Sequence, residues 1–129
     1  MTHHNNIGVI GGGSWATAIV KMLSNNAKHL HWWVRNESVA EHIRSYKHNP
    51  NYLTSVQFEP NKLALSCNLR NVVLNCENLI MAIPSAFLKD ALKDLNANDF
   101  VGKKVFSAIK GIVPEHNLIV GEYFNTQFN

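Results

Sequence analysis

The chain has 129 residues, of which 46% are hydrophobic, and a formal net charge of +3. This length and composition predict one globular domain with a core of its own, and they exclude a disordered or repetitive chain. Its 12 Lys and Arg residues are scattered, which argues against a nucleic-acid surface and leaves small anionic ligands as compatible partners.

The sequence also bears on compartment and on metal binding. It contains no apolar run near the roughly 20 residues that cross a bilayer, and its start lacks a secretory signal pattern. We therefore expect a cytoplasmic protein without a membrane partner. Cys67 and Cys76 lack metal or redox spacing and are interpreted as reduced thiols. The seven histidines are dispersed, so no metal site is expected.

Residues 7–18, IGVIGGGSWATA, form an apolar strand that runs directly into a glycine turn and a helix. Gly11 permits the tight turn, Gly13 lets backbone approach a ligand, and the small Ala16 allows close packing of helix on strand. The N–H groups of the first helical turn can then bind two phosphates. The pattern therefore favours dinucleotide binding over a purely structural glycine turn.

A second apolar run at residues 30–34 predicts the next strand, which completes a β-α-β unit of roughly 30 residues. NAD-binding proteins place an acidic residue at its end, where it binds the ribose 2′-hydroxyl, but this chain has Arg35. A guanidinium would instead attract the 2′-phosphate of NADP. A preference for NADPH over NADH is therefore our hypothesis, with a solvated loop arginine as the alternative.

Further elements follow in alternation. We predict a helix over 39–46 that ends before Pro50, a short strand at 63–65 and a helical turn at 69–74. The apolar run 79–83 predicts a strand covered on both faces. Ser85 is expected to cap a helix whose inner face carries five apolar residues: Phe87, Leu88, Ala91, Leu92 and Leu95. A strand at 105–109 and a last helix from near Glu115 toward Phe124 complete the prediction.

This alternation predicts an α/β fold of the Rossmann type, with a doubly wound and mostly parallel sheet. Ligands of such sheets lie beyond the carboxyl ends of the strands. Gly11, Arg35, Pro84 and Lys110 all fall at predicted carboxyl ends, so we expect them to share one site.

Residues 11–18, GGGSWATA, resemble the G-x-G-x-[WY]-G-T-A signature of NAD(P)-dependent glycerol-3-phosphate dehydrogenase. Ala16 stands where that family usually has glycine, which narrows the contact between helix and strand. Four further blocks resemble the family in the same order: WVR at 33–35, NPNYL at 49–53, AIPS at 82–85 and KGI at 110–112.

The resemblance implies a two-domain oxidoreductase that reduces dihydroxyacetone phosphate to sn-glycerol 3-phosphate with NAD(P)H, for phospholipid synthesis. Residues 1–129 would be its dinucleotide-binding domain. The helical substrate domain, with a second and catalytic lysine, would be absent from this chain. We therefore do not expect this chain alone to catalyse the reaction. We expect its exposed faces to be able to pair with a second copy as a homodimer.

The resemblance also implies roles for single residues. Ser14 and Trp15 would contact the cofactor, with core packing as the alternative for Trp15. Tyr52 would close over the adenosine side, and Pro84 would shape a turn near the nicotinamide; their alternatives are a surface aromatic and a strand terminator. Lys110 would reach cofactor and substrate together, where an ammonium favours an anionic substrate and polarises its carbonyl.

Two other functions stay open at this stage. Another hydroxyacid or sugar-nucleotide dehydrogenase would share the cofactor fold. Activity of the complete enzyme on a panel of substrates would distinguish these enzymes from a glycerol-3-phosphate dehydrogenase. A non-catalytic NAD(P)-sensing module belongs to a different class, because a fold does not determine function. Its gene would continue into a channel, transporter or regulator.

Overall fold

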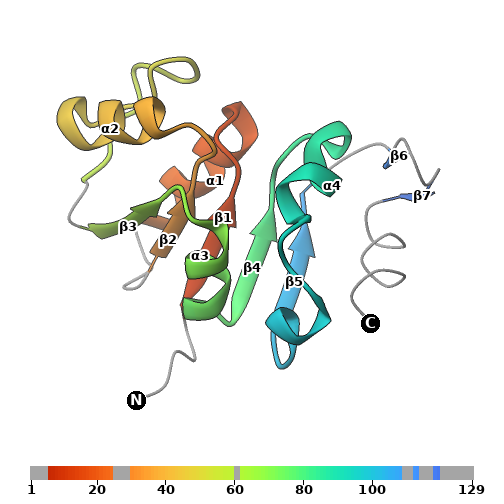
Figure 1. The fold of residues 1–129 in the computed structure, drawn as a ribbon. Coiled ribbons are helices and arrows are strands. Elements are labelled where there is room, and N and C mark those ends of the chain that lie inside the picture. The colour runs from red at the N-terminus through yellow and green to blue at the C-terminus, as the bar shows by residue number, and fades with distance from the viewer. Residues whose placement is uncertain (1–5, 25–29, 60–61, 109–111, 114–117, 120–129) are drawn as a thin grey trace.

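The computed structural model describes residues 6–24, 30–59, 62–108, 112–113 and 118–119. Five parallel strands form one sheet in the order β3-β2-β1-β4-β5 (Figure 1). These strands are β1 (Ile7–Ile10), β2 (Leu30–Trp33), β3 (Leu63–Ser66), β4 (Asn78–Met81) and β5 (Lys104–Ser107). The predicted parallel α/β sheet is confirmed, with the strand order of the Rossmann fold.

Helices connect successive strands and cover both faces of the sheet (Figure 1). They are α1 (Ser14–Ser24), α2 (Glu37–Tyr46), α3 (Leu69–Asn75), α4 (Ser85–Leu92) and the 3-10 helix η2 (Ala97–Phe100). Successive strand residues point to opposite faces. Val9 accordingly joins the core beneath α1 and α2, whereas Ile10 joins the core beneath α3 and α4. Burial on both faces explains the continuous apolar runs that predicted these strands.

The carboxyl end of β1 is where the chain switches direction across the sheet. β1 pairs with β2 on one side and β4 on the other, with Ile10 opposite Trp33 and Met81. The connections from these strands leave toward opposite faces, which opens a crevice at this point. The fold therefore places the ends of β1, β2 and β4 side by side.

Several predicted boundaries differ from the structure. α2 begins at Glu37 because the Asn36 side chain caps it, and it ends before Lys47, which has a left-handed φ of 67°. Pro50 therefore does not terminate this helix. Leu118–Ile119 form strand β7, antiparallel to β6 (Ile112–Val113), so the helix predicted from near Glu115 is wrong at those residues. The rest of that helix lies outside the described residues.

Helix α4 differs from the prediction at its start and on its inner face. Ser85 is its first residue, and Pro84 holds the N-cap position that we expected Ser85 to hold. Leu88 and Leu92 are buried as predicted, but Phe87 is 51% exposed. Each helical residue is rotated about 100° from the one before it. Phe87 therefore lies off the core-facing stripe, on the side of α4 that borders the crevice.

No helix in the described ranges has the length and apolarity to span a bilayer.

Candidate functional site

The turn between β1 and α1 shows why glycine is needed at two positions for different reasons. Gly11 has a φ of 140°, and a Cβ there would lie 2.6 Å from the carbonyl oxygen of Ala82. Only glycine fits this close approach between the ends of β1 and β4. At Gly13 a Cβ would meet no atom within 4 Å, so open space adjoins the turn. The completely buried Ala16 brings α1 onto the sheet.

All three glycine carbonyls of the turn accept hydrogen bonds from the protein. The indole Nε1 of Trp32 donates to the oxygen of Gly11 at 2.6 Å. The side-chain amide of Asn49 donates to the oxygen of Gly12 at 3.0 Å. The hydroxyl and backbone N–H of Thr17 donate to the oxygen of Gly13 at 2.6 and 2.9 Å.

These bonds determine what the turn presents to a ligand. In a trans peptide the N–H points opposite to the carbonyl that precedes it. With the carbonyls held by the protein, the N–H groups of Gly12, Gly13 and Ser14 point the other way. The first N–H groups of α1 also have no acceptor within the helix and lie at its positive end. The turn is therefore arranged to bind an anion.

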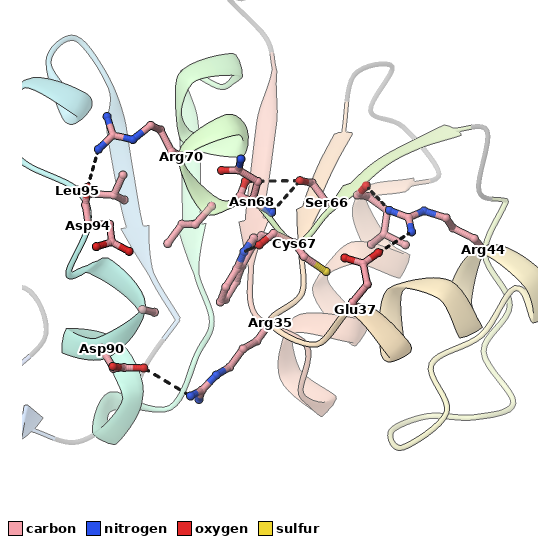
Figure 2. A pocket seen from close by; sticks show the side chains of 14 residues that line it. Arg35, Glu37, Arg44, Ser66, Cys67, Asn68, Arg70, Asp90, Asp94 and Leu95 are labelled. Carbon is pink, nitrogen blue, oxygen red and sulfur yellow. Dashed lines mark hydrogen bonds and ion pairs between the residues drawn. The ribbon is translucent and has the colours of Figure 1, made fainter.

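Arg35 lies at the end of β2, as predicted, with a side chain that is 66% exposed. It extends toward α4, where its guanidinium lies 3.5 Å from the Asp90 carboxylate (Figure 2). The guanidinium also lies 5.7 Å from the ring centre of Phe87. Arg35 and Asp90 border a cavity of about 850 Å³ between the α2 and α4 sides of the crevice, and Phe87 lines a smaller cavity beside it.

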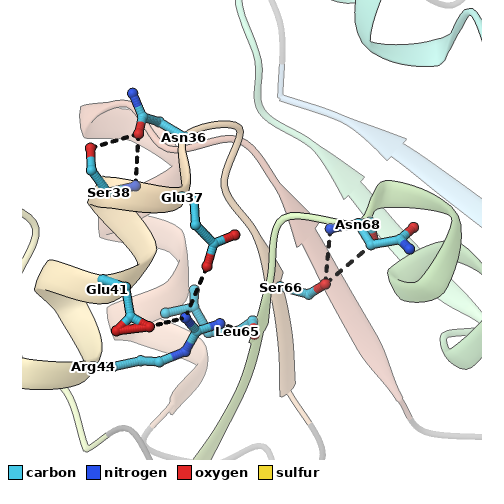
Figure 3. A network of polar contacts seen from close by, with 8 residues as sticks. All are labelled: Asn36, Glu37, Ser38, Glu41, Arg44, Leu65, Ser66 and Asn68. Carbon is cyan, nitrogen blue, oxygen red and sulfur yellow. Dashed lines mark hydrogen bonds and ion pairs between the residues drawn. The ribbon is translucent and has the colours of Figure 1, made fainter.

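The other two arginines of this cavity are more fully engaged. Arg44 donates to Glu41 at 3.1 Å, to Glu37 at 3.4 Å and to the carbonyl of Leu65 at 3.0 Å (Figure 3). Arg70 donates to Asp99 at 3.1 Å and to the carbonyl of Asp94 at 2.5 Å. Within the described ranges, Arg35 is therefore the cavity arginine that is most available to an added anion.

Two smaller cavities connect Arg35 with the glycine turn. One, of about 300 Å³, is lined by Gly13, Arg35, Tyr52 and Pro84 among others. The other, of about 280 Å³, lies on the side of Ser14 and Trp15, and Gly13, Tyr52 and Pro84 line it as well. An elongated ligand could thus cross the carboxyl ends of the strands. Trp15 is 58% exposed, which excludes the alternative that it packs in the core.

The structure brings together most of the residues that we predicted for the site. Gly13, Ser14, Trp15, Arg35, Tyr52 and Pro84 line these connected cavities, and Gly11 and Ala16 shape the turn behind them. Lys110 lies outside the described residues. The sequence analysis assigned no role to Trp32 and Asn49, which hold the turn, or to Asp90, which pairs with Arg35, although Asn49 begins the block NPNYL that resembles the family. Their partners are distant along the chain, so no local pattern revealed these contacts.

Cys67 lines the largest of the three cavities described above, whereas Cys76 is buried in the core just before the amino end of β4. Burial raises the pKa of Cys67 to about 11, with a further contribution from Glu37. Burial raises the pKa of Cys76 to about 12. Both thiols are therefore protonated at neutral pH. Among the described residues, no group of three or more His, Cys, Asp or Glu side chains is arranged to hold a metal ion.

A glycine turn of this geometry, at the switch point of a parallel sheet in the order 3-2-1-4-5, defines a dinucleotide-binding domain of the Rossmann class. The particular family follows from comparison with known proteins. Residues 6–129 match the family described as the N-terminus of NAD-dependent glycerol-3-phosphate dehydrogenase, and the chain belongs to that family.

Individual relatives agree with this assignment. The chain is 35% identical over 112 residues to glycerol-3-phosphate dehydrogenase [NAD(P)+] of Pseudomonas fluorescens, covering 87% of this chain and 31% of that one. The homologue of Halalkalibacterium halodurans is 29% identical over 117 residues, covering 91% of this chain and 33% of that one. The crystal structure of the Coxiella burnetii enzyme superposes with a TM-score of 0.84 at 17% identity, covering 98% of this chain and 38% of that one.

The chain thus spans about a third of the length of the relatives that it matches. More distant oxidoreductases share the fold. An imine reductase from Pseudomonas sp. superposes with a TM-score of 0.63 at 15% identity, covering 87% of this chain and 34% of that one. At 17% and 15% identity, the likeness to these two solved structures establishes the fold alone.

Proposed function

We propose that this chain is the cofactor-binding part of a glycerol-3-phosphate dehydrogenase, which transfers hydride between NAD(P)H and dihydroxyacetone phosphate and gives sn-glycerol 3-phosphate for phospholipid synthesis. The observation that carries the proposal is the glycine turn, whose three carbonyls are held by Trp32, Asn49 and Thr17 beside open space at Gly13. That arrangement leaves backbone N–H groups for a pyrophosphate.

The residues present fit a nicotinamide dinucleotide across the connected cavities. The turn and the N-terminus of α1 would hold the pyrophosphate. Arg35 would bind a ribose 2′-phosphate, with Tyr52 against the adenosine side. Trp15 and Pro84 would border the nicotinamide side. When bound, the nicotinamide supplies the hydride, while this chain binds the dinucleotide and orients it.

Lys110 is our proposed contact to the substrate. It follows the carboxyl end of β5, which pairs with β4 beside the glycine turn. There its ammonium would attract the phosphate substrate and stabilise charge that develops on the carbonyl oxygen. Proton donation would fall to the lysine of a second, helical domain, which we propose follows residues 1–129 in the longer enzyme.

The function is tested on two levels. Titration of the 129-residue chain with NADPH and NADH should change cofactor fluorescence, and no response to either would contradict the cofactor assignment. In the longer enzyme, Lys110→Ala should lower kcat/KM by orders of magnitude for dihydroxyacetone phosphate. Lys104→Ala, at the opposite end of β5, is the matched control and should leave kcat/KM unchanged.

The partners of the proposed enzyme are small phosphorylated molecules. A cytoplasmic location and a homodimer remain predictions, which cell fractionation and analytical ultracentrifugation test. A substrate panel that favoured another hydroxyacid or a sugar nucleotide would replace the proposed substrate while leaving the cofactor site in place.

A further inference from the structure

Asn49 is a completely buried polar residue in which both ends of the side-chain amide are engaged. Its Nδ2 donates to the Gly12 carbonyl at 3.0 Å and to the Thr17 hydroxyl at 3.1 Å. Its Oδ1 accepts from the backbone N–H groups of Asn51 and Tyr52 at 2.9 and 3.2 Å. An amide has two donor hydrogens and two acceptor lone pairs, so the hydrogen-bonding capacity of Asn49 is used in full.

The two ends of this amide bind different parts of the site. The donor end holds the glycine turn and α1, which lie 37 and 32 residues away in sequence. The acceptor end holds the backbone of the segment that carries Tyr52. Tyr52 is 46% exposed and lines both small cavities. One side chain therefore connects the phosphate-facing turn with the aromatic residue beside it.

The hydrogen bonds also have a defined direction. The Thr17 hydroxyl donates its single hydrogen to the Gly13 carbonyl at 2.6 Å, so it accepts from Asn49. Asn49 thus acts on Gly12 directly and on Gly13 through Thr17. Without the donor end, the Gly12 peptide loses the bond that holds its carbonyl, and a carbonyl that turned outward would repel a phosphate.

We propose that Asn49 is a positioning residue that couples the pyrophosphate-binding turn to the Tyr52 segment, so that diphosphate binding and the adenosine-side contact of Tyr52 strengthen each other. The inference rests on the proposed function, because it concerns the same dinucleotide site. It assigns Asn49 no contact with the cofactor. Its effect reaches the ligand through Gly12, Thr17 and Tyr52.

Four variants separate the two ends of the amide. Asn49→Asp keeps an acceptor for the N–H groups of Asn51 and Tyr52 but removes the donor to Gly12, and Asn49→Ala removes both ends. Thr17→Val removes the hydroxyl at similar shape, whereas Thr17→Ser retains it. Asn96→Ala is the matched control, since the Asn96 side chain caps η2 by accepting from Asn98 and lines none of the three cavities described above.

The main measurement is the Kd for NADPH of the 129-residue chain, with a thermal melt of every variant. Asn49→Asp and Asn49→Ala should weaken binding about tenfold or more. Thr17→Val should weaken it less, and Thr17→Ser and Asn96→Ala should bind like the wild type. If the Asn49 variants do not fold, the Thr17 pair decides: equal Kd values for Val and Ser would overturn the proposal.

A double-mutant cycle distinguishes positioning from a general loss of stability. Tyr52→Ala should weaken binding by a smaller factor in the Asn49→Ala background than in the wild type, because the coupling has already been lost. An identical factor in both backgrounds would overturn the coupling.

Amide hydrogen exchange supplies a readout without cofactor. The N–H groups of Asn51 and Tyr52 should exchange slowly in the wild type and in Asn49→Asp, and faster in Asn49→Ala. Fast exchange in the wild type would overturn this inference while leaving the proposed function in place. A wild-type chain that binds no dinucleotide would overturn both.

Discussion

The guanidinium of Arg35, at the end of β2, lies 3.5 Å from the carboxylate of Asp90 on α4 (Figure 2). The two side chains are 66% and 58% exposed, so water screens the pair and it contributes little to stability. The doubly charged 2′-phosphate of NADP could therefore displace Asp90 from Arg35. The same carboxylate would repel that phosphate, so Asp90 opposes the preference that Arg35 favours.

We predict that Arg35→Glu lowers the affinity for NADPH relative to NADH by about tenfold or more, because a forked ion pair is replaced by repulsion. Asp90→Asn should shift the ratio a few-fold the other way. Isothermal titration with both cofactors measures the two ratios. Arg70→Gln, in the same cavity but paired with Asp99, is the control; an unchanged ratio in Arg35→Glu would remove Arg35 from this role.

Gly13→Val should leave the fold intact and abolish dinucleotide binding. A Cβ at Gly13 meets no atom within 4 Å, so the branched side chain has room in the free protein. That room is the space in which we propose the pyrophosphate lies. A melting temperature near that of the wild type, with no fluorescence response to NADPH, is the expected result. Wild-type affinity would show that the pyrophosphate lies elsewhere.

Gly11→Ala, unlike Gly13→Val, should destabilise the folded protein even without a ligand. Its φ of 140° is unfavourable for an L-residue, and the new Cβ would lie 2.6 Å from the Ala82 oxygen. Backbone strain of this kind costs about 1–3 kcal/mol, before the clash is added. Urea denaturation should show a lower free energy of unfolding. Gly102→Ala is the comparison, because Gly102 has a φ of 76° but its Cβ would meet nothing within 4 Å.

The buried thiols should make the native state less stable at alkaline pH. In the unfolded chain a cysteine ionises near pH 9.0, whereas the pKa of Cys76 in the folded chain is raised to about 12. The unfolded state therefore loses its proton first as the pH rises. Stability contributed by the protonated thiol is complete below pH 9.0 and is lost toward about pH 12.

Thiol labelling provides the measurement. Below pH 9.0 both cysteines should react much more slowly in the native chain than in urea, and Cys67, with a pKa of about 11, should react before Cys76. Cys76→Ala should reduce the alkaline loss of stability. Equal labelling rates for native and unfolded protein would contradict the predicted burial.

Short-range features of the site could be predicted because their physics is local. The strand, turn and helix of residues 7–18 are consecutive, so spacing alone indicated that Gly11 makes the turn and Ala16 packs beneath it. The alternation of apolar runs with amphipathic segments likewise predicted a parallel sheet. The same alternation placed Arg35 at the carboxyl end of the second strand. The boundaries of α2 and α4 were less accurate. α2 begins where the Asn36 side chain caps it, and α4 begins with Pro84 at the N-cap position and no side-chain capping hydrogen bond.

The sequence by itself thus determined the class of fold and the location of the phosphate-facing turn. Only the tertiary structure decided which side chains hold that turn and which carboxylate pairs with Arg35. Trp32 donates to Gly11 across 21 residues, Asn49 donates to Gly12 across 37, and Asp90 meets Arg35 across 55. Hydrogen bonds and ion pairs require atoms to meet within a few ångströms. For residues so far apart along the chain, sheet order and helix packing create that proximity, and no local spacing encodes it.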